Sequence, residues 1–105
     1  MSGGTGDARR VGLPAPAGWY VDAMLRADGA LVFEAQILRP GLPEYEYVVT
    51  LPADQVPALR DALAVPAEGD LTAELVRRGE EITPHLHAWL RELGLRPELW
   101  THLGD

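Results

Sequence analysis

The sequence predicts an α+β domain in which a three-stranded antiparallel meander is followed by three helices packed on one face of the sheet. Three observations support this prediction. Apolar residues alternate with period two between residues 19 and 51, and they recur at helical spacing between residues 54 and 93. Prolines and glycines cluster between these runs, where turns are needed. The chain has 105 residues, which is enough for one domain.

Residues 1–18 precede the periodic region and are rich in glycine, proline and alanine. Such a composition buries little apolar surface and is typical of a terminal segment without fixed structure. We therefore expect residues 1–18 to form a flexible arm and residues 19–105 to form the folded domain.

Strands are expected over residues 19–28, 30–39 and 44–51. The pair Asp28–Gly29 is typical of a two-residue type I′ hairpin, which requires positive φ at both positions. Pro40 and Pro43 interrupt the ladder before the third strand. One face of these strands is apolar and the other mixes apolar and polar residues. Three interpretations stay open for the mixed face: a partner surface, a cover made by a fourth strand or by the arm, or a sheet face open to water.

Helices are expected over residues 54–64, 71–78 and 84–93, with a short turn at 97–101 that packs back on the domain. Asp70 is a candidate N-cap of the second helix and Gly79 a candidate C′ residue. Thr83 and Pro84 are a cap and a first-turn proline that open the last helix.

The residue types exclude several kinds of chemistry. The chain has no cysteine, so it has no disulfide, no thiolate metal site and no cysteine nucleophile. Its one serine, Ser2, lies in the arm, which rules out a Ser-His-Asp triad. His85 and His87 are two residues apart on a predicted helix and point in different directions, so a shared metal would need His102 and an acid such as Glu81 as well. We expect no catalytic site, no cofactor and no bound metal.

The charge balance limits the partners. The net charge is −7, and all of it lies in residues 44–105, which hold twelve acids and five bases. A nucleic-acid partner is disfavoured because it would repel an acidic protein. No apolar run is long enough for a membrane helix and no signal peptide is recognised, so we expect a cytoplasmic protein. All nine basic residues are arginine, which indicates a GC-rich genome rather than phosphate recognition.

The leading functional hypothesis is a non-catalytic acidic domain that binds a basic protein partner. Two side chains, Tyr20 and Met24, would anchor such a partner. The acids that would steer it are Glu44, Glu46, Asp54, Asp61, Glu80 and Glu81. The unpaired edges of the sheet also make a homodimer conceivable. The alternative hypothesis is a small-molecule pocket between sheet and helices, lined by Trp19, Phe33, Tyr47, His85 and Trp89.

Two segments carry a resemblance to a group of proteins. Residues 45–59 read YEYVVTLPADQVPAL and residues 94–100 read GLRPELW. With its tyrosine-rich strand, its V-P-x-L helix start and its aromatic residue near the C-terminus, the chain resembles small actinomycete α+β proteins, some of which look like immunity proteins. The resemblance implies a protein that binds and neutralises a cognate toxin. It assigns no functional residue.

Overall fold

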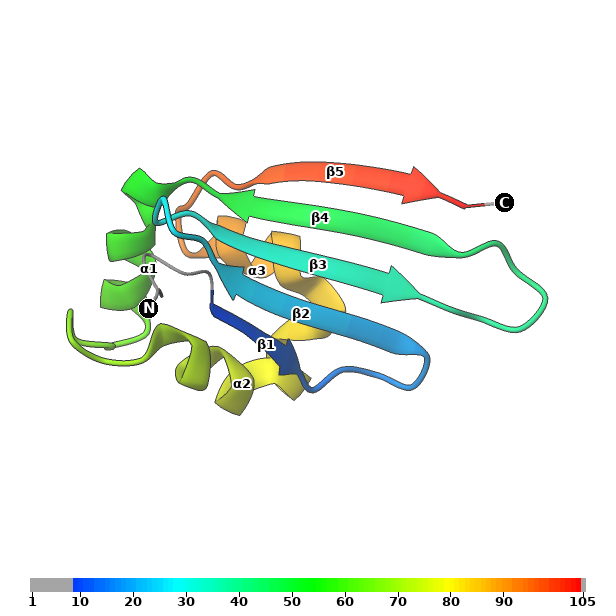
Figure 1. Ribbon diagram of the computed structural model, residues 1–105, viewed down its shortest axis with the longest axis horizontal. Helices are drawn as coiled ribbons and strands as arrows, with labels where there is room; N and C mark the ends of the chain where they lie inside the picture. The colour runs from blue at the N-terminus through cyan, green and yellow to red at the C-terminus, as the bar shows by residue number, and fades with distance from the viewer. Residues whose placement is uncertain (1–8, 105) are drawn as a thin grey trace, which may run out of the picture.

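A five-stranded antiparallel sheet forms one layer of the structure, and helices cover one of its faces (Figure 1). The structure is a computed structural model, and it describes residues 9–104. The strand order is β1-β2-β3-β4-β5, so every strand pairs with its neighbour in the series. The strands span Arg9–Leu13, Trp19–Leu25, Leu31–Ile37, Tyr45–Leu51 and Glu98–Leu103. The α+β class and the antiparallel sheet are confirmed, but the sheet has five strands rather than three or four.

All helices lie between β4 and β5 in the sequence. A 3₁₀ turn, η1 (Ala53–Gln55), leads into α1 (Val56–Ala62), and α2 (Leu71–Ile82) runs through η2 (Thr83–His85) directly into α3 (Leu86–Glu92). Asp70 caps α2 as predicted, since its carboxylate accepts a hydrogen bond from the Ala73 N–H. In Figure 1, α3 lies behind the strands, α1 lies at the left end of the sheet and α2 lies below β1.

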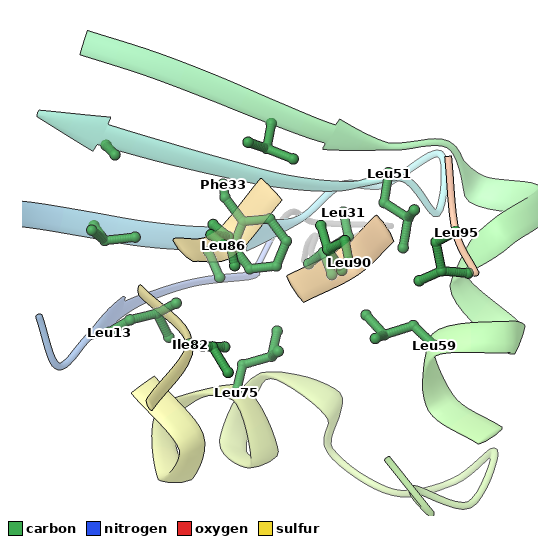
Figure 2. Packing of buried hydrophobic residues seen from close by; sticks show 14 of the residues in the cluster. Leu13, Leu31, Phe33, Leu51, Leu59, Leu75, Ile82, Leu86, Leu90 and Leu95 are labelled. Atoms are coloured by element: carbon green, nitrogen blue, oxygen red, sulfur yellow. The ribbon is translucent and has the colours of Figure 1, made fainter. Parts of the chain in front are cut away.

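The core lies between the inner face of the sheet and the helices (Figure 2). Because side chains alternate along a strand, the odd-numbered residues of β2, β3 and β4 point to the helices. Phe33 on β3 is completely buried and packs with apolar residues of the helical layer, among them Leu75, Ile82, Leu86 and Leu90. Burial of this face fixes which side chains remain on the outer face.

The prediction of a flexible arm over residues 1–18 is wrong for its second half. Residues 9–13 form β1, which pairs with β2 in the register Arg9 with Leu25 through Leu13 with Val21. Leu13 is buried in the core, and this burial stabilises a strand whose sequence has little strand propensity. Residues 1–8 lie outside the described residues.

The prediction of a short turn at residues 97–101 is also wrong. Residues 98–103 form β5, an edge strand that pairs antiparallel with β4. The run Leu99-Trp100-Thr101-His102-Leu103 has no period-two alternation, because two apolar residues are followed by two polar ones, and Pro97 and the short length favoured a turn. A strand of this kind is stabilised mainly by an existing neighbour, here β4.

Two turn predictions need correction. The β2–β3 connection runs from Arg26 to Ala30, and only Gly29 has a positive φ, so the hairpin is not of type I′. Gly79 does not end a helix but lies in the interior of α2, against Pro14. The helix continues to Ile82 because this face of it packs on the end of β1.

Candidate functional site

The outer face of the sheet is the larger candidate surface. Across residues 9–104 every helix lies on the opposite face, so no helix covers the outer side chains of the strands. The register aligns them in rows that run across the sheet. The central row crosses all five strands and holds Gly12, Asp22, Glu34, Val48 and Trp100. The next row holds Tyr20, Gln36, Glu46 and His102.

These two rows enclose a hollow of about 300 Å³ on the outer face. Tyr20 on β2 and Trp100 on β5 are among its lining residues and are 62% and 54% exposed. We call this feature the acidic hollow and define it by the outer-face residues that line it: Tyr20, Asp22, Glu34, Gln36, Glu46, Val48 and Trp100. A polar, carboxylate-bearing surface thus lies between two exposed aromatic rings.

Arg10 organises the charge at one side of the acidic hollow. Asp22 and Glu34 lie directly opposite each other on β2 and β3, an arrangement that is unfavourable for two like charges. The Arg10 guanidinium relieves this repulsion, because it donates to Glu34 Oε1 at 2.7 Å and to Asp22 Oδ2 at 2.8 Å. These two hydrogen bonds, the one to Glu34 first, raise the pKa of Arg10 above its ordinary value.

Glu46 is placed differently. Among the ion pairs of residues 9–104, none involves Glu46. Its cross-strand neighbours are Gln36 on β3 and His102 on β5, and the His102 ring stacks on Trp100 with 5.8 Å between the ring centroids. Three carboxylates and one guanidinium therefore leave a net excess of two negative charges here.

A second, shallower hollow continues along the outer face. It has a volume of about 600 Å³ and shares Glu34 and Val48 with the acidic hollow. Met24, Val32 and Thr50 lie in its floor, with the β2–β3 turn at its end. The outer face thus offers a continuous surface that is acidic at one end and apolar toward the other.

The residues predicted to bind a partner fall into two groups. Tyr20 and Glu46 line the acidic hollow and Met24 lines the second hollow. Glu44 accepts a hydrogen bond from Gln36 beside the acidic hollow. The other four acids lie on the helical layer, exposed and away from the outer face: Asp54 in η1, Asp61 in α1, and Glu80 and Glu81 in α2.

Among the residues of this site that sequence reasoning did not single out are Arg10, Asp22, Glu34 and Trp100. Asp22 and Glu34 were placed on the outward face but not singled out, because their adjacency depends on the register of β2 with β3. Arg10 and Trp100 lie on the two strands that were not predicted. The local pattern of residues 99–103 held no signal that would have placed Trp100 on the outer face, because its position depends on the pairing of β5 with β4.

The predicted small-molecule pocket corresponds in part to a hollow on the inner side. This inner hollow has a volume of about 330 Å³ and lies between the inner face of the sheet and the segment that joins η2 to α3. Trp19, Tyr47 and His85 line it as expected, together with Tyr45 and Leu99. Phe33 and Trp89 do not, since Phe33 is buried in the core and Trp89 packs against the core. Burial, and then the neighbouring Tyr45, raise the pKa of Tyr47.

The described residues hold neither a cluster of metal ligands nor a membrane-spanning helix. Within residues 9–104, no three histidine or acidic side chains are grouped so that they would hold a metal ion, and His85, His87 and His102 do not converge. No helix in this part of the chain has the length and apolar character needed to cross a membrane.

Comparisons with family models, curated proteins and solved structures return no match to this chain.

Proposed function

We propose that this protein is a non-catalytic interaction domain whose acidic hollow binds a cationic side chain on a basic segment of a partner protein. The observation that carries the proposal is the position of Glu46, without a cation partner among the described residues, in a hollow lined by the exposed rings of Tyr20 and Trp100. A guanidinium or ammonium group is attracted both by carboxylates and by the faces of aromatic rings.

The exposed aromatic rings of Tyr20 and Trp100 support a role of this surface in binding a partner protein. Tyrosine and tryptophan are enriched at the centres of protein interfaces, because they bury a large area at little cost in conformational entropy. Beside them, Val48 and Met24 provide apolar contact for the rest of a bound segment. The surface therefore suits a peptide segment that combines basic and apolar residues.

The acidic net charge supports the same class of partner. A charge of −7 accelerates encounters with a basic protein and slows encounters with nucleic acid. A toxin with a basic surface, neutralised by an immunity- or antitoxin-like protein, is the specific partner class that we propose. This assignment rests on charge and on the sequence resemblance.

The test uses a fluorescein-labelled octapeptide of alternating arginine and glycine as the probe. We expect fluorescence anisotropy to show binding at about 50 mM NaCl and strong weakening at about 500 mM, where the Debye length falls below 5 Å. Glu46→Gln should weaken binding by about fivefold, because it removes a carboxylate beside the bound cation. Arg10→Gln should strengthen binding, because it removes the cation that competes for Asp22 and Glu34.

The matched control is Glu80→Gln, which changes the net charge as Glu46→Gln does but lies on α2, away from the outer face. Equal effects of Glu46→Gln and Glu80→Gln would reduce the binding to nonspecific attraction and would contradict the proposal. Circular dichroism of each variant establishes that the fold is retained.

The inner hollow favours one alternative function, the binding of a small apolar or aromatic ligand. Trp19, Ile37, Tyr45 and Leu99 give this hollow a mainly apolar lining, and His85 supplies a polar group. Titration with 1-anilinonaphthalene-8-sulfonate tests it. Saturable dye binding that Leu99→Asp abolishes and Trp100→Ala leaves unchanged would support a ligand site in the inner hollow.

A further inference from the structure

Strand β5 is an exposed edge strand with an apolar sequence. All six of its residues are exposed, and Leu99, Trp100 and Leu103 are 49%, 54% and 63% exposed. Within residues 9–104, no strand pairs with the free edge of β5. Its only charged residue is Glu98, the first residue of the strand, so it lacks the lysines, prolines or bulges that usually prevent edge-to-edge pairing.

The opposite edge of the sheet is protected. Strand β1 packs against α2, and the Thr83 hydroxyl at the end of α2 donates to the Pro14 carbonyl at 3.0 Å. Arg9 on β1 forms an ion pair of 2.8 Å with Asp70 at the start of α2. The two edges therefore differ, and only the β5 edge presents apolar side chains beside an open backbone.

The register of β5 with β4 determines which backbone N–H and C=O groups of β5 point to the free edge. The Gly104 N–H donates to the Glu44 carbonyl, and the β4–β5 pairing continues in the same register through Glu98 and Thr50. In an antiparallel ladder, the residues that hydrogen-bond to one neighbour alternate with those that face the other side. The N–H and C=O groups of Leu99, Thr101 and Leu103 therefore point away from β4, to the free edge.

We propose that β5 pairs antiparallel with β5 of a second copy of this chain, with the two Thr101 residues opposite each other at the twofold axis. This proposal goes beyond the proposed function, because it concerns the edge of the sheet, and it shares only Trp100 with the acidic hollow.

The proposed register uses every outward-facing backbone group of β5. With Thr101 opposite the second copy's Thr101, Leu99 lies opposite the second copy's Leu103, and all three outward-facing residues form hydrogen-bonded pairs. A register shifted by two residues in one direction places Leu103 opposite Pro97, which has no N–H to donate, and a shift in the other direction places Leu99 opposite a position beyond the end of β5. An odd shift would pair residues that point to opposite faces of the sheet.

The side chains in this register are also self-complementary. On the inner face, each exposed Leu99 meets a Leu103, which covers apolar surface beside the inner hollow. On the outer face, Trp100 lies opposite the second copy's His102 and extends the Trp100–His102 stack across the axis. The result is a continuous sheet of two five-stranded halves in which both acidic hollows open on the same side.

The test is a charge-swap experiment followed by sedimentation equilibrium on the full chain. We expect the wild-type protein to reach twice the mass of one chain as its concentration rises. Thr101→Lys and Thr101→Glu should each raise the dimer dissociation constant by about tenfold or more, because like charges then face each other at the axis. An equimolar mixture of the two variants should restore the dimer as a heterodimer, since Lys then faces Glu.

The matched controls are Leu38→Lys and Leu38→Glu, at an exposed residue whose N–H bonds to Gly18 on the β2 side of the sheet. They should leave dimerisation unchanged. Salt separates this proposal from binding to a basic partner: the dimer joins two acidic chains and should tighten with salt, whereas peptide binding should weaken. A wild-type monomer at all concentrations and salts, or Thr101 variants whose mixture does not restore the dimer, would overturn the proposal.

Discussion

Gly79, in the interior of α2, packs directly on Pro14, the residue that follows β1. A Cβ added to Gly79 would lie 2.8 Å from the Pro14 nitrogen, closer than real side-chain contacts allow. The close approach brings α2 onto β1 and lets the Thr83 hydroxyl reach the Pro14 carbonyl. This contact orders the first strand and covers that edge of the sheet.

Gly79→Ala should therefore destabilise the protein by about 1–3 kcal/mol, the usual cost of overpacking. The sign of this change in stability is informative, because alanine in a helix interior otherwise stabilises a protein by about 1 kcal/mol relative to glycine. Urea denaturation measures the change. Gly12→Ala in β1 is the control, because its Cβ would make an ordinary contact of 3.6 Å with Asp22 and should cost little.

Stability at acid pH should depend on Asp70. A hydrogen bond from the Thr72 hydroxyl, and then one from the Ala73 N–H, hold the pKa of Asp70 below its ordinary value near 3.8. A lowered native pKa contributes stability above the unfolded pKa, and this stability is lost as the pH falls through the native value. The free energy of unfolding of Asp70→Asn should fall less between about pH 5 and pH 2 than that of the wild type. A free energy of unfolding that falls equally steeply in Asp70→Asn and in the wild type would contradict this role of Asp70.

Truncation of Phe33 should lower the stability of the protein far more than truncation of Tyr20, although both were candidate binding residues. Phe33→Ala should cost about 3–5 kcal/mol of stability, because the ring is fully buried in the core. Tyr20→Ala should change stability by less than about 0.5 kcal/mol, because the ring is exposed on the outer face. Denaturation midpoints with unchanged slopes would report both effects, and a large loss in Tyr20→Ala would show that this ring is structural.

Tyr47 should ionise above the usual pH range of a phenol. Because burial raises the pKa of Tyr47 above 10.0, an ultraviolet titration should contain a final step above pH 10 that Tyr47→Phe removes. A raised native pKa contributes stability below the unfolded pKa, and this stability is lost as the pH rises through the native value. Unfolding that coincides with the final step in the wild type, but not in Tyr47→Phe, would fit this linkage.

Period-two alternation with a strongly apolar face predicted β2, β3 and β4 from the sequence. Their inner faces hold fully buried residues such as Phe33 and Val49, and this burial determines which side chains face the helices. The edge strands were missed for the opposite reason. β1 is short and glycine-containing and β5 follows a proline, so each depends on pairing with its neighbour more than on its own propensity.

The candidate site could be predicted only in part. Tyr20 and Glu46 were identified because an exposed aromatic and an acid on the outward face of a strand are visible in the alternation. Their position beside Trp100 was not visible, because β5 comes after the helices and joins β4 across about fifty residues of sequence. The pairing of Asp22 with Glu34, and the role of Arg10, likewise depended on the register.

The sequence by itself determined the α+β class, the central strands, the cap of α2 and the absence of cysteine chemistry, because these follow from local periodicity and residue types. The tertiary structure decided that the chain ends of the domain become edge strands, that Gly79 serves close packing rather than helix termination, and which acids share a surface. Contacts between residues far apart in the chain produce each of these features, and local patterns do not encode the partners of such contacts.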